Sequence, residues 1–231
     1  SQPSQPSQPS QPSQPSQPSQ PSQPSQPSQP SQPSQPSQPS QPSQPSEPEL
    51  KFIDVNEGDW FYNSVMWAVK NGVTVGTTPT TFEPYTACTR AQMIEFLWNA
   101  VGKPAATIKS VPFTDVPESG SDDYWYEDSL LWAYEAGIVA GTNDGSTFSP
   151  DQVCTRAEMI SFIARLLSDG ATADMPFVDV PASAWYYNEV QWAWANGLTV
   201  GTNDGTTFSP DNACIRAEAV EFLYNAFAEV E

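Results

Sequence analysis

The sequence predicts an all-α fold with pseudo-threefold symmetry, in which three related repeats share one helical core. A five-residue motif beginning with cysteine and containing an arginine occurs three times, at 88–92, 154–158 and 214–218. Each copy precedes an apolar run with helical spacing. The motif arginines are 66 and 60 residues apart, and a unit of about 60 residues buries too little surface to fold alone. The three units should therefore form one compact domain.

A low-complexity segment precedes the repeats. Residues 1–45 are fifteen Ser-Gln-Pro triplets, which contain no apolar residue to build a core and should be disordered. Proline fixes its own φ and keeps the preceding residue out of the α region, which favours polyproline II. We therefore expect residues 1–48 to form a semi-rigid spacer that reaches up to about 140 Å. A tail without a specific role is the alternative, and its serines are candidates for O-linked sugars.

The repeats are predicted at 49–106, 107–172 and 173–231. Each opens with Phe-x-Asp-Val and continues with a tryptophan, a glycine and the motif arginine. The corresponding residues are Asp54, Asp115 and Asp179; Trp60, Trp125 and Trp185; Gly76, Gly141 and Gly201; and Arg90, Arg156 and Arg216.

Each repeat is expected to contain two helices. The first has an apolar stripe at offsets 0, 3 and 4 and ends at a glycine in the left-handed conformation. The second has apolar residues at offsets 0, 3, 4, 7 and 8, a wide face for packing around a shared axis. The first stripes start at Val65, Leu130 and Val190, the terminating glycines are Gly72, Gly137 and Gly197, and the second stripes start at Met93, Met159 and Ala219.

The repeated motif resembles a helix start. Thr89 with Gln92, and Thr155 with Glu158, have the capping-box spacing, in which a hydroxyl and an acid or amide each accept a backbone N–H. Ile215 interrupts this pattern, which should weaken the third helix start by about 0.5–2 kcal/mol unless another group caps it.

The motif cysteines are expected to be buried free thiols. Cys88, Cys154 and Cys214 occupy equivalent positions, so a disulfide between two of them would leave the third alone. A zinc site would need closely spaced ligands of the Cys-x-x-Cys type, which the sequence lacks.

The motif arginine has no evident local role, because its charge faces the positive end of the helix dipole. One explanation is an internal ion pair, for example with Asp54, Asp115 or Asp179. The other is an anion site, in which free amides at the helix N-terminus and the guanidinium bind a carboxylate. Arg156 is the first candidate, and Arg156→Ala is expected to weaken binding without disturbing the fold.

Composition excludes several classes of partner. The chain has 8 Lys and Arg, 27 Asp and Glu, no histidine and a net charge of -19, which argues against binding nucleic acid or an anionic membrane. The absence of histidine removes the commonest general base and metal ligand. No apolar run reaches the roughly 18 residues of a membrane span. We expect no cofactor and no metal, and the lack of an initiator Met or signal peptide indicates a mature form or a fragment.

The order Phe-x-Asp-Val, Trp, Gly, Asp-Gly-x-x-Phe-x-Pro and Thr-Arg-Ala-Glu resembles the S-layer homology (SLH) domain, in three copies from about Phe52 to the C-terminus. The resemblance implies a three-pronged extracellular domain. Such a domain anchors bacterial surface proteins non-covalently to secondary cell-wall polysaccharide, which often carries a pyruvate ketal. It also implies ligand contacts in grooves between repeats, through the Asp, Trp, Gly and Arg residues named above.

The residue types at those positions suit a sugar that bears a carboxylate. Tryptophan offers a flat apolar face, glycine permits close approach, and arginine pairs bidentately with a carboxylate. A core wedge is the alternative for Trp60, Trp125 and Trp185, whereas Trp67, Trp132 and Trp192 are expected in the core. Repeat two is the most typical, because repeat one has 78–80 Thr-Pro-Thr and Gln92, and repeat three has Ile215.

Three alternatives to a wall anchor remain. A glycan-cleaving enzyme could use Glu95, Asp151 or Glu158, but these acids lie on helix surfaces and turns rather than in a shared cleft. The chain could also be the anchoring region of a surface enzyme whose catalytic part lies outside it. A calcium module is suggested by Asn-Asp-Gly, although an EF-hand loop does not fit. The prediction is a non-enzymatic anchor, with self-association in a surface layer left open.

Overall fold

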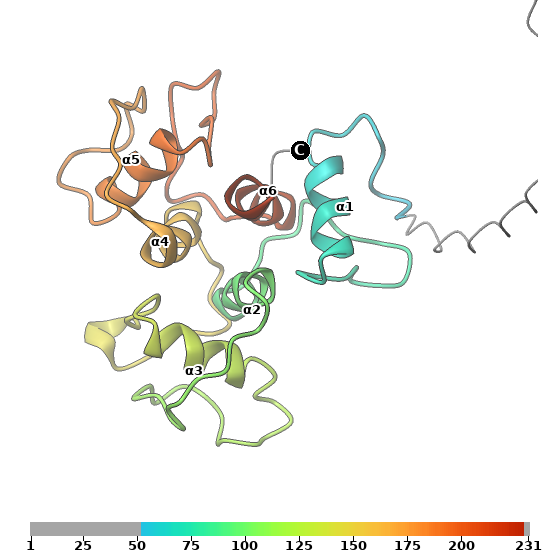
Figure 1. Ribbon diagram of the computed structural model, residues 1–231, viewed down its shortest axis with the longest axis vertical. Helices are drawn as coiled ribbons and strands as arrows, with labels where there is room; N and C mark the ends of the chain where they lie inside the picture. The colour runs from blue at the N-terminus through green and yellow to red at the C-terminus, as the bar shows by residue number, and fades with distance from the viewer. Residues whose placement is uncertain (1–51, 229–231) are drawn as a thin grey trace, which may run out of the picture. The chain divides into compact units, whose positions relative to one another are not determined.

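The computed structural model describes residues 52–228, and this part of the chain is helical (Figure 1). The spacer predicted for residues 1–48 lies outside the described residues. Between 52 and 228 there are isolated β-bridges but no strand, which confirms the all-α prediction. The helices are α1 (Tyr62–Lys70), α2 (Arg90–Ala100), α3 (Glu127–Glu135), the short 3₁₀ turn η1 (Asn143–Gly145), α4 (Arg156–Leu167), α5 (Tyr187–Ala195) and α6 (Arg216–Phe227).

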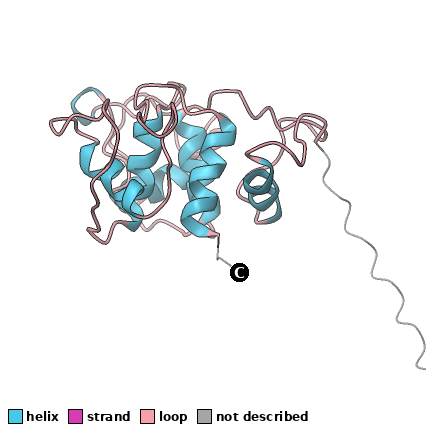
Figure 2. Cartoon of the chain, turned by 90° about the horizontal axis from the view of Figure 1, so that it is seen from above, coloured by secondary structure: helices cyan, strands magenta, loops and turns pink. Residues whose placement is uncertain are grey.

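The second helices of the repeats, α2, α4 and α6, contact one another at the centre, and each carries one outer helix (Figure 1). The outer helix belongs to the following repeat: α3 packs on α2, and α5 packs on α4. The first outer helix, α1, packs on α6 and closes the ring between the first and last repeats. Figure 2 shows the helices and their long connecting loops from a second direction. No helix in residues 52–228 is long and apolar enough to span a bilayer.

The cysteines of the motif meet where the three repeats join. The backbone N–H of Cys88 donates to the carbonyl of Cys214 (3.0 Å), that of Cys154 to Cys88 (2.9 Å), and that of Cys214 to Cys154 (2.9 Å). This closed ring of hydrogen bonds gives the domain its pseudo-threefold axis. All three thiols are free and fully buried, as predicted.

The local helix signals behave as expected. Gly72, Gly137 and Gly197 follow the first helices with φ of 67°, 71° and 71°. Both complete capping boxes form, at Thr89 and Thr155. Ile215 has no side-chain acceptor, so α6 keeps only the bond from the Ile215 N–H to the Glu218 carboxylate (3.2 Å).

The predicted apolar stripes form the core. The first three members of each second-helix stripe are buried, and Trp132 and Trp192 are buried with them. Trp67 is half-buried and packs edge-on against Tyr224, with ring centroids 5.8 Å apart. Tyr134 differs from the prediction because its ring is exposed and covers Phe113 from outside. The buried members of the second-helix stripes are Met93, Phe96, Leu97, Met159, Phe162, Ile163, Ala219, Phe222 and Leu223.

Burial should make the cysteines unreactive in the native protein. It raises the pKa of the Cys88 thiol to about 12, and the pKa values of Cys154 and Cys214 lie well above their ordinary value for the same reason. At pH 8 the thiolate, which is the reactive form, is therefore scarce. Titration with a chromogenic disulfide should detect no fast-reacting thiol in native protein and three in urea. Rapid reaction of all three in native protein would contradict this burial.

Candidate functional site

Each motif arginine crosses from its own repeat into the next one. The Nε of Arg90 donates to the carbonyl of Phe148 (2.9 Å), that of Arg156 to Phe208 (2.9 Å), and that of Arg216 to Phe82 (2.8 Å). Each guanidinium also lies over the ring of the phenylalanine to which it donates. The arginines therefore hold neighbouring repeats together.

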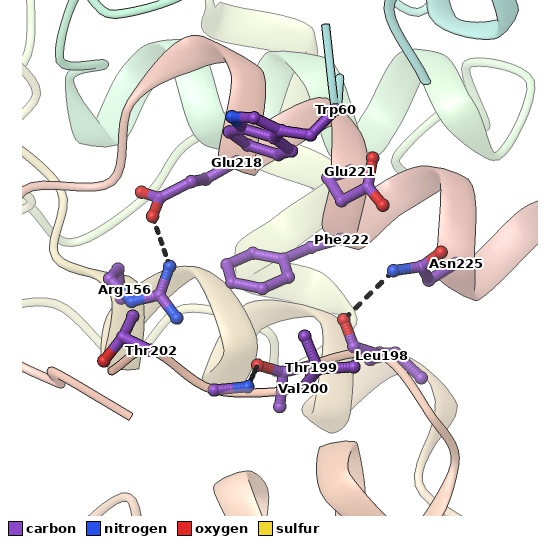
Figure 3. A pocket seen from close by; sticks show the side chains of 11 residues that line it. Trp60, Arg156, Leu198, Thr199, Val200, Thr202, Glu218, Glu221, Phe222 and Asn225 are labelled. Atoms are coloured by element: carbon purple, nitrogen blue, oxygen red, sulfur yellow. Dashed lines mark hydrogen bonds and ion pairs between the residues drawn. The ribbon is translucent and has the colours of Figure 1, made fainter. Parts of the chain in front are cut away.

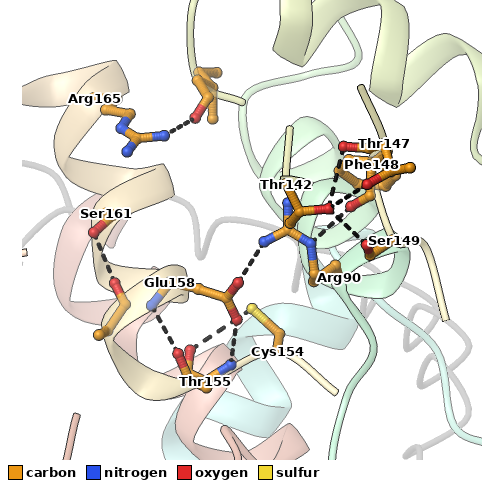
Figure 4. Close-up of polar contacts among 12 residues, drawn as sticks. Arg90, Thr142, Thr147, Phe148, Ser149, Cys154, Thr155, Glu158, Ser161 and Arg165 are labelled. Carbon is orange, nitrogen blue, oxygen red and sulfur yellow. Dashed lines mark hydrogen bonds and ion pairs between the residues drawn. The ribbon is translucent and has the colours of Figure 1, made fainter. Parts of the chain in front are cut away.

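Two of the arginines also form ion pairs across the repeat boundary. Nη1 of Arg90 is 2.5 Å from Oε1 of Glu158, and Nη1 of Arg156 is 2.5 Å from Oε1 of Glu218. The other oxygen of each glutamate accepts the N–H of the N-cap residue of its own helix, Thr155 or Ile215. Figure 4 shows this arrangement at Glu158. The ion pairs thus use the glutamate of the capping box and not the aspartates expected from the sequence.

The repeated aspartates instead support the loop that the arginine grips. Asp115 accepts the N–H of Phe148 (2.8 Å) and that of Ser149 (2.7 Å), where Ser149 has a left-handed φ of 57°. Asp54 and Asp179 accept the corresponding amides in their own repeats. The Phe148 residue is consequently held through its N–H by Asp115 and through its carbonyl by Arg90.

Arg216 differs from the other two arginines. The equivalent of Glu158 in repeat one is Gln92, so no carboxylate in residues 52–228 pairs with Arg216. Its Nη2 donates instead to the carbonyl of Val75 (3.0 Å). Burial lowers the pKa of this guanidinium, although nearby acids oppose the shift.

The helix N-termini do not offer free amides, which corrects the anion-site hypothesis. The N–H groups of Arg90 and Ala91 donate to the carbonyls of Gln152 (2.9 Å) and Pro150 (3.1 Å) in the next repeat. The first two amides of α4 and α6 are satisfied in the same way. The side chains, and not the helix ends, must therefore recognise any anion.

A cavity of about 430 Å³ lies where the three repeats meet (Figure 3). Trp60 comes from repeat one, Arg156 from repeat two, and the remaining wall from the loop and α6 of repeat three. The predicted site residues thus come together across repeats, and not within one repeat. The lining residues are Trp60, Arg156, Leu198, Thr199, Val200, Gly201, Thr202, Glu218, Glu221, Phe222 and Asn225.

We call this cavity the Arg156 groove. By pseudo-threefold equivalence, the corresponding residues of the other repeats form two further sets, which we name in the same way. The Arg90 groove combines Arg90 with Gly141 and Trp185, and the Arg216 groove combines Arg216 with Gly76 and Trp125. The resemblance implies grooves between repeats, but which residues share one groove depends on which helices pack against each other. Asp179, Asp115 and Asp54 lie behind these walls as loop supports.

The first tryptophan of each repeat is on the surface, so the core-wedge alternative is wrong. Trp60, Trp125 and Trp185 are 56%, 56% and 58% exposed. Each packs one edge against the aromatic residue that follows it. A broad indole face therefore remains available beside the groove.

The glycines of the site leave room for a phenylalanine of their own repeat. A Cβ atom at Gly201 would lie 2.4 Å from Cε1 of Phe177 and 2.6 Å from the carbonyl oxygen of Thr207. A Cβ atom at Gly141 would lie 2.6 Å from Cε1 of Phe113. Close packing under the groove is thus the role that the structure gives these glycines.

Sequence reasoning missed the polar wall contributed by the second helix. Glu218, Glu221 and Asn225 line the cavity on one face of α6, and Asn225 donates to the carbonyl of Leu198 (3.3 Å). Their spacing of three and four residues marks a helix face. That face could have been found from the sequence as the polar strip beside the apolar stripe.

The alternative functions gain no site from the described residues. No group of three or more Cys, Asp or Glu side chains between 52 and 228 is arranged to hold a metal ion. Glu158, one of the acids considered for catalysis, is held by Arg90 and by the N–H of Thr155. Burial raises the pKa of Glu95, another of the acids considered for catalysis.

A glutamate in place of Gln92, the repeat-one equivalent of Glu158, should stabilise the domain. Gln92→Glu supplies Arg216 with the carboxylate that the other arginines have, while keeping an acceptor for the Thr89 N–H. A hydrogen bond to a charged group contributes about 1.5–3 kcal/mol, so thermal unfolding should shift upward by several degrees.

The matched substitution is Glu218→Gln, which removes one existing pair and should lower the unfolding temperature. Arg156→Ala should lower it more, because the variant also loses the hydrogen bond to the Phe208 carbonyl and leaves the partly buried Glu218 without its cation. The contacts of Arg156 thus predict a loss of stability in this variant, whereas the sequence alone led us to expect an undisturbed fold. A lower unfolding temperature for Gln92→Glu would contradict the ion-pair interpretation.

Comparison with known proteins agrees with the repeat structure. The family model for the S-layer homology domain matches residues 51–94, 112–160 and 176–220, which together make up more than half of the chain. Each match ends within the second helix of a repeat.

Similar proteins include cell-surface proteins and an enzyme. A cell surface protein of Thermoanaerobacter kivui is 35% identical over 55% of this chain and 16% of its own length. The surface-layer 125 kDa protein of Lysinibacillus sphaericus is 34% identical over 40% of this chain and 8% of its own length. An endoglucanase of Bacillus sp. (strain KSM-635) is 33% identical over 49% of this chain and 11% of its own length. The chain thus spans a small part of each of these relatives. It belongs to the S-layer homology domain family, whose members are non-catalytic modules that anchor proteins to the cell wall at the outer surface of the cell.

Proposed function

We propose that the chain anchors its protein by binding an anionic secondary cell-wall polysaccharide, which carries a pyruvyl ketal, in the grooves between repeats. The observation that carries this proposal is the Arg156 groove. Its cavity of about 430 Å³ combines an exposed Trp60 with the guanidinium of Arg156, which is 3% exposed and pairs with Glu218. A cavity of this size is within the usual range for small ligands.

The walls of the groove suit a pyranose ring. The flat apolar face of Trp60 can stack on the C–H face of a sugar, while its N–H remains available as a donor. Thr202, Glu218 and Asn225 supply hydroxyl, carboxylate and amide groups within the same lining. A few polar groups placed around an apolar surface fix the orientation of a ligand.

Charge explains why the ligand is recognised at separate points. The whole chain has a net charge of -19, so it repels an acidic polymer at long range, apart from spots that present a guanidinium. Arginine binds a carboxylate with two parallel hydrogen bonds. Simultaneous binding at three related grooves would then raise the overall affinity of the domain for the polymer, even where each single contact is weak.

A second candidate is favoured by the endoglucanase relative, which matches this chain over 11% of its own length. The chain would then be the anchoring region of a longer carbohydrate-active enzyme, with the chemistry elsewhere in that protein. The chain itself is proposed to be non-enzymatic in both cases. Self-association in a surface layer stays a prediction.

Wall binding can be tested by sedimentation with purified walls that carry a pyruvylated polymer. The protein should sediment with intact walls and remain in solution with walls from which the polymer has been stripped. Trp60→Ala should weaken binding about three- to tenfold, because a stacking surface is lost. Val178→Ala is the control, since Val178 is 83% exposed and lies outside the cavity lining. Equal binding to stripped and intact walls would overturn the proposal.

A further inference from the structure

One position in the polar wall differs between the repeats. Near the C-terminal end of α2, α4 and α6, a side chain donates to the loop that follows the first helix of its own repeat. Asn99 donates to the carbonyl of Val73 (2.9 Å), Asn225 to Leu198 (3.3 Å), and Arg165 to Ile138 (3.0 Å). The equivalent bonds show that Arg165 occupies the place of the two asparagines.

This equivalence locates Arg165 in the Arg90 groove. Asn225 lines the Arg156 groove together with Trp60, which precedes the outer helix α1. The packing of α5 on α4 corresponds to that of α1 on α6. Trp185 and Arg165 therefore occupy the positions that correspond to those of Trp60 and Asn225. Figure 4 shows Arg165 and Glu158 extending to the same side of α4.

Arg165 is a cation that a ligand can reach. Its side chain is exposed, and neither ion pair in residues 52–228 involves it. Arg90, in the same groove, is neutralised by Glu158. Arg216 also lacks a carboxylate partner in this part of the chain, but it is only 6% exposed and lies between the rings of Phe82 and Phe96.

The acids of the wall also differ between the grooves. One equivalent position of the second helices carries Glu95 in α2, Ser161 in α4 and Glu221 in α6. Glu221 lines the Arg156 groove. On the outer helix, α5 has Glu189 where α1 has Ser64, yet Glu189 forms no ion pair with Arg165. The Arg90 groove thus holds two arginines beside Glu158 and Glu189, whereas the Arg156 groove holds one arginine beside Glu218 and Glu221.

We propose that Arg165 and Trp185 form the principal carboxylate subsite of the domain, so that the Arg90 groove takes the carboxylate-bearing sugar. This inference rests on the proposed binding of wall polysaccharide. The guanidinium of Arg165 uses Nη1 for the loop carbonyl, and its other N–H groups can pair with a carboxylate. The indole of Trp185 supports the ring of the same sugar.

The test compares walls before and after mild-acid hydrolysis, which removes the pyruvyl ketal and leaves the neutral sugar. Arg165→Asn installs the residue that the other two repeats carry, so the fold should tolerate it. On untreated walls this variant should bind about tenfold more weakly than the unaltered protein and lose much of its salt dependence. On acid-treated walls the two proteins should bind alike.

The control is Lys70→Asn, which removes the same charge from an exposed position at the end of α1, outside the cavity lining. It should bind untreated walls like the unaltered protein. The reverse change, Asn225→Arg with Glu221→Ser, should strengthen binding to untreated walls only.

The outcomes separate this inference from the proposed function. If the unaltered protein does not distinguish intact from stripped walls, the proposed function fails. If it does, but Arg165→Asn behaves like Lys70→Asn, the subsite at Arg165 is overturned. A loss of binding confined to Gln92→Glu would also overturn it and would assign the carboxylate to Arg216.

Discussion

The contact on which the structure depends is the guanidinium that passes from one repeat into the next. A buried arginine is costly unless its charge and its N–H groups are satisfied, and here the phenylalanine carbonyl and the capping glutamate satisfy them. The same side chain forms the floor of the Arg156 groove. The residue that holds two repeats together thus also lines the proposed binding groove, so a variant that removes it affects both.

Local features of the fold could be predicted from the sequence, and long-range ones could not. The ends of the helices follow from nearby glycines and capping residues, and the buried faces follow from spacing. The position of α1 against α6 depends on residues more than 140 positions apart, which no local pattern encodes. For that reason the family resemblance implies grooves between repeats but not which residues share a groove, as Trp60, Arg156 and Gly201 do from three different repeats.

The backbone is more symmetrical than the chemistry it carries. Ile215 removes the side-chain cap of α6, yet this helix begins at the equivalent residue, because the carbonyls of Thr86 and Pro84 accept its first two amides. Support from the neighbouring repeat thus frees individual motif positions to vary. Gln92, Ser161 and Arg165 are such variations, and they give the three grooves different charges on a common frame.

Closure of the ring by α1 and α6 fixes the number of repeats. In an open solenoid each unit contacts only its neighbours, so units can be added or lost at an end. Here the outer helix of the first repeat finds its partner only in the last one. A chain with two repeats would leave two apolar helix faces uncovered, and a fourth would have to break the existing pair. The domain should also complete its folding late, once its final helix has formed, because the closing contact spans most of the folded chain.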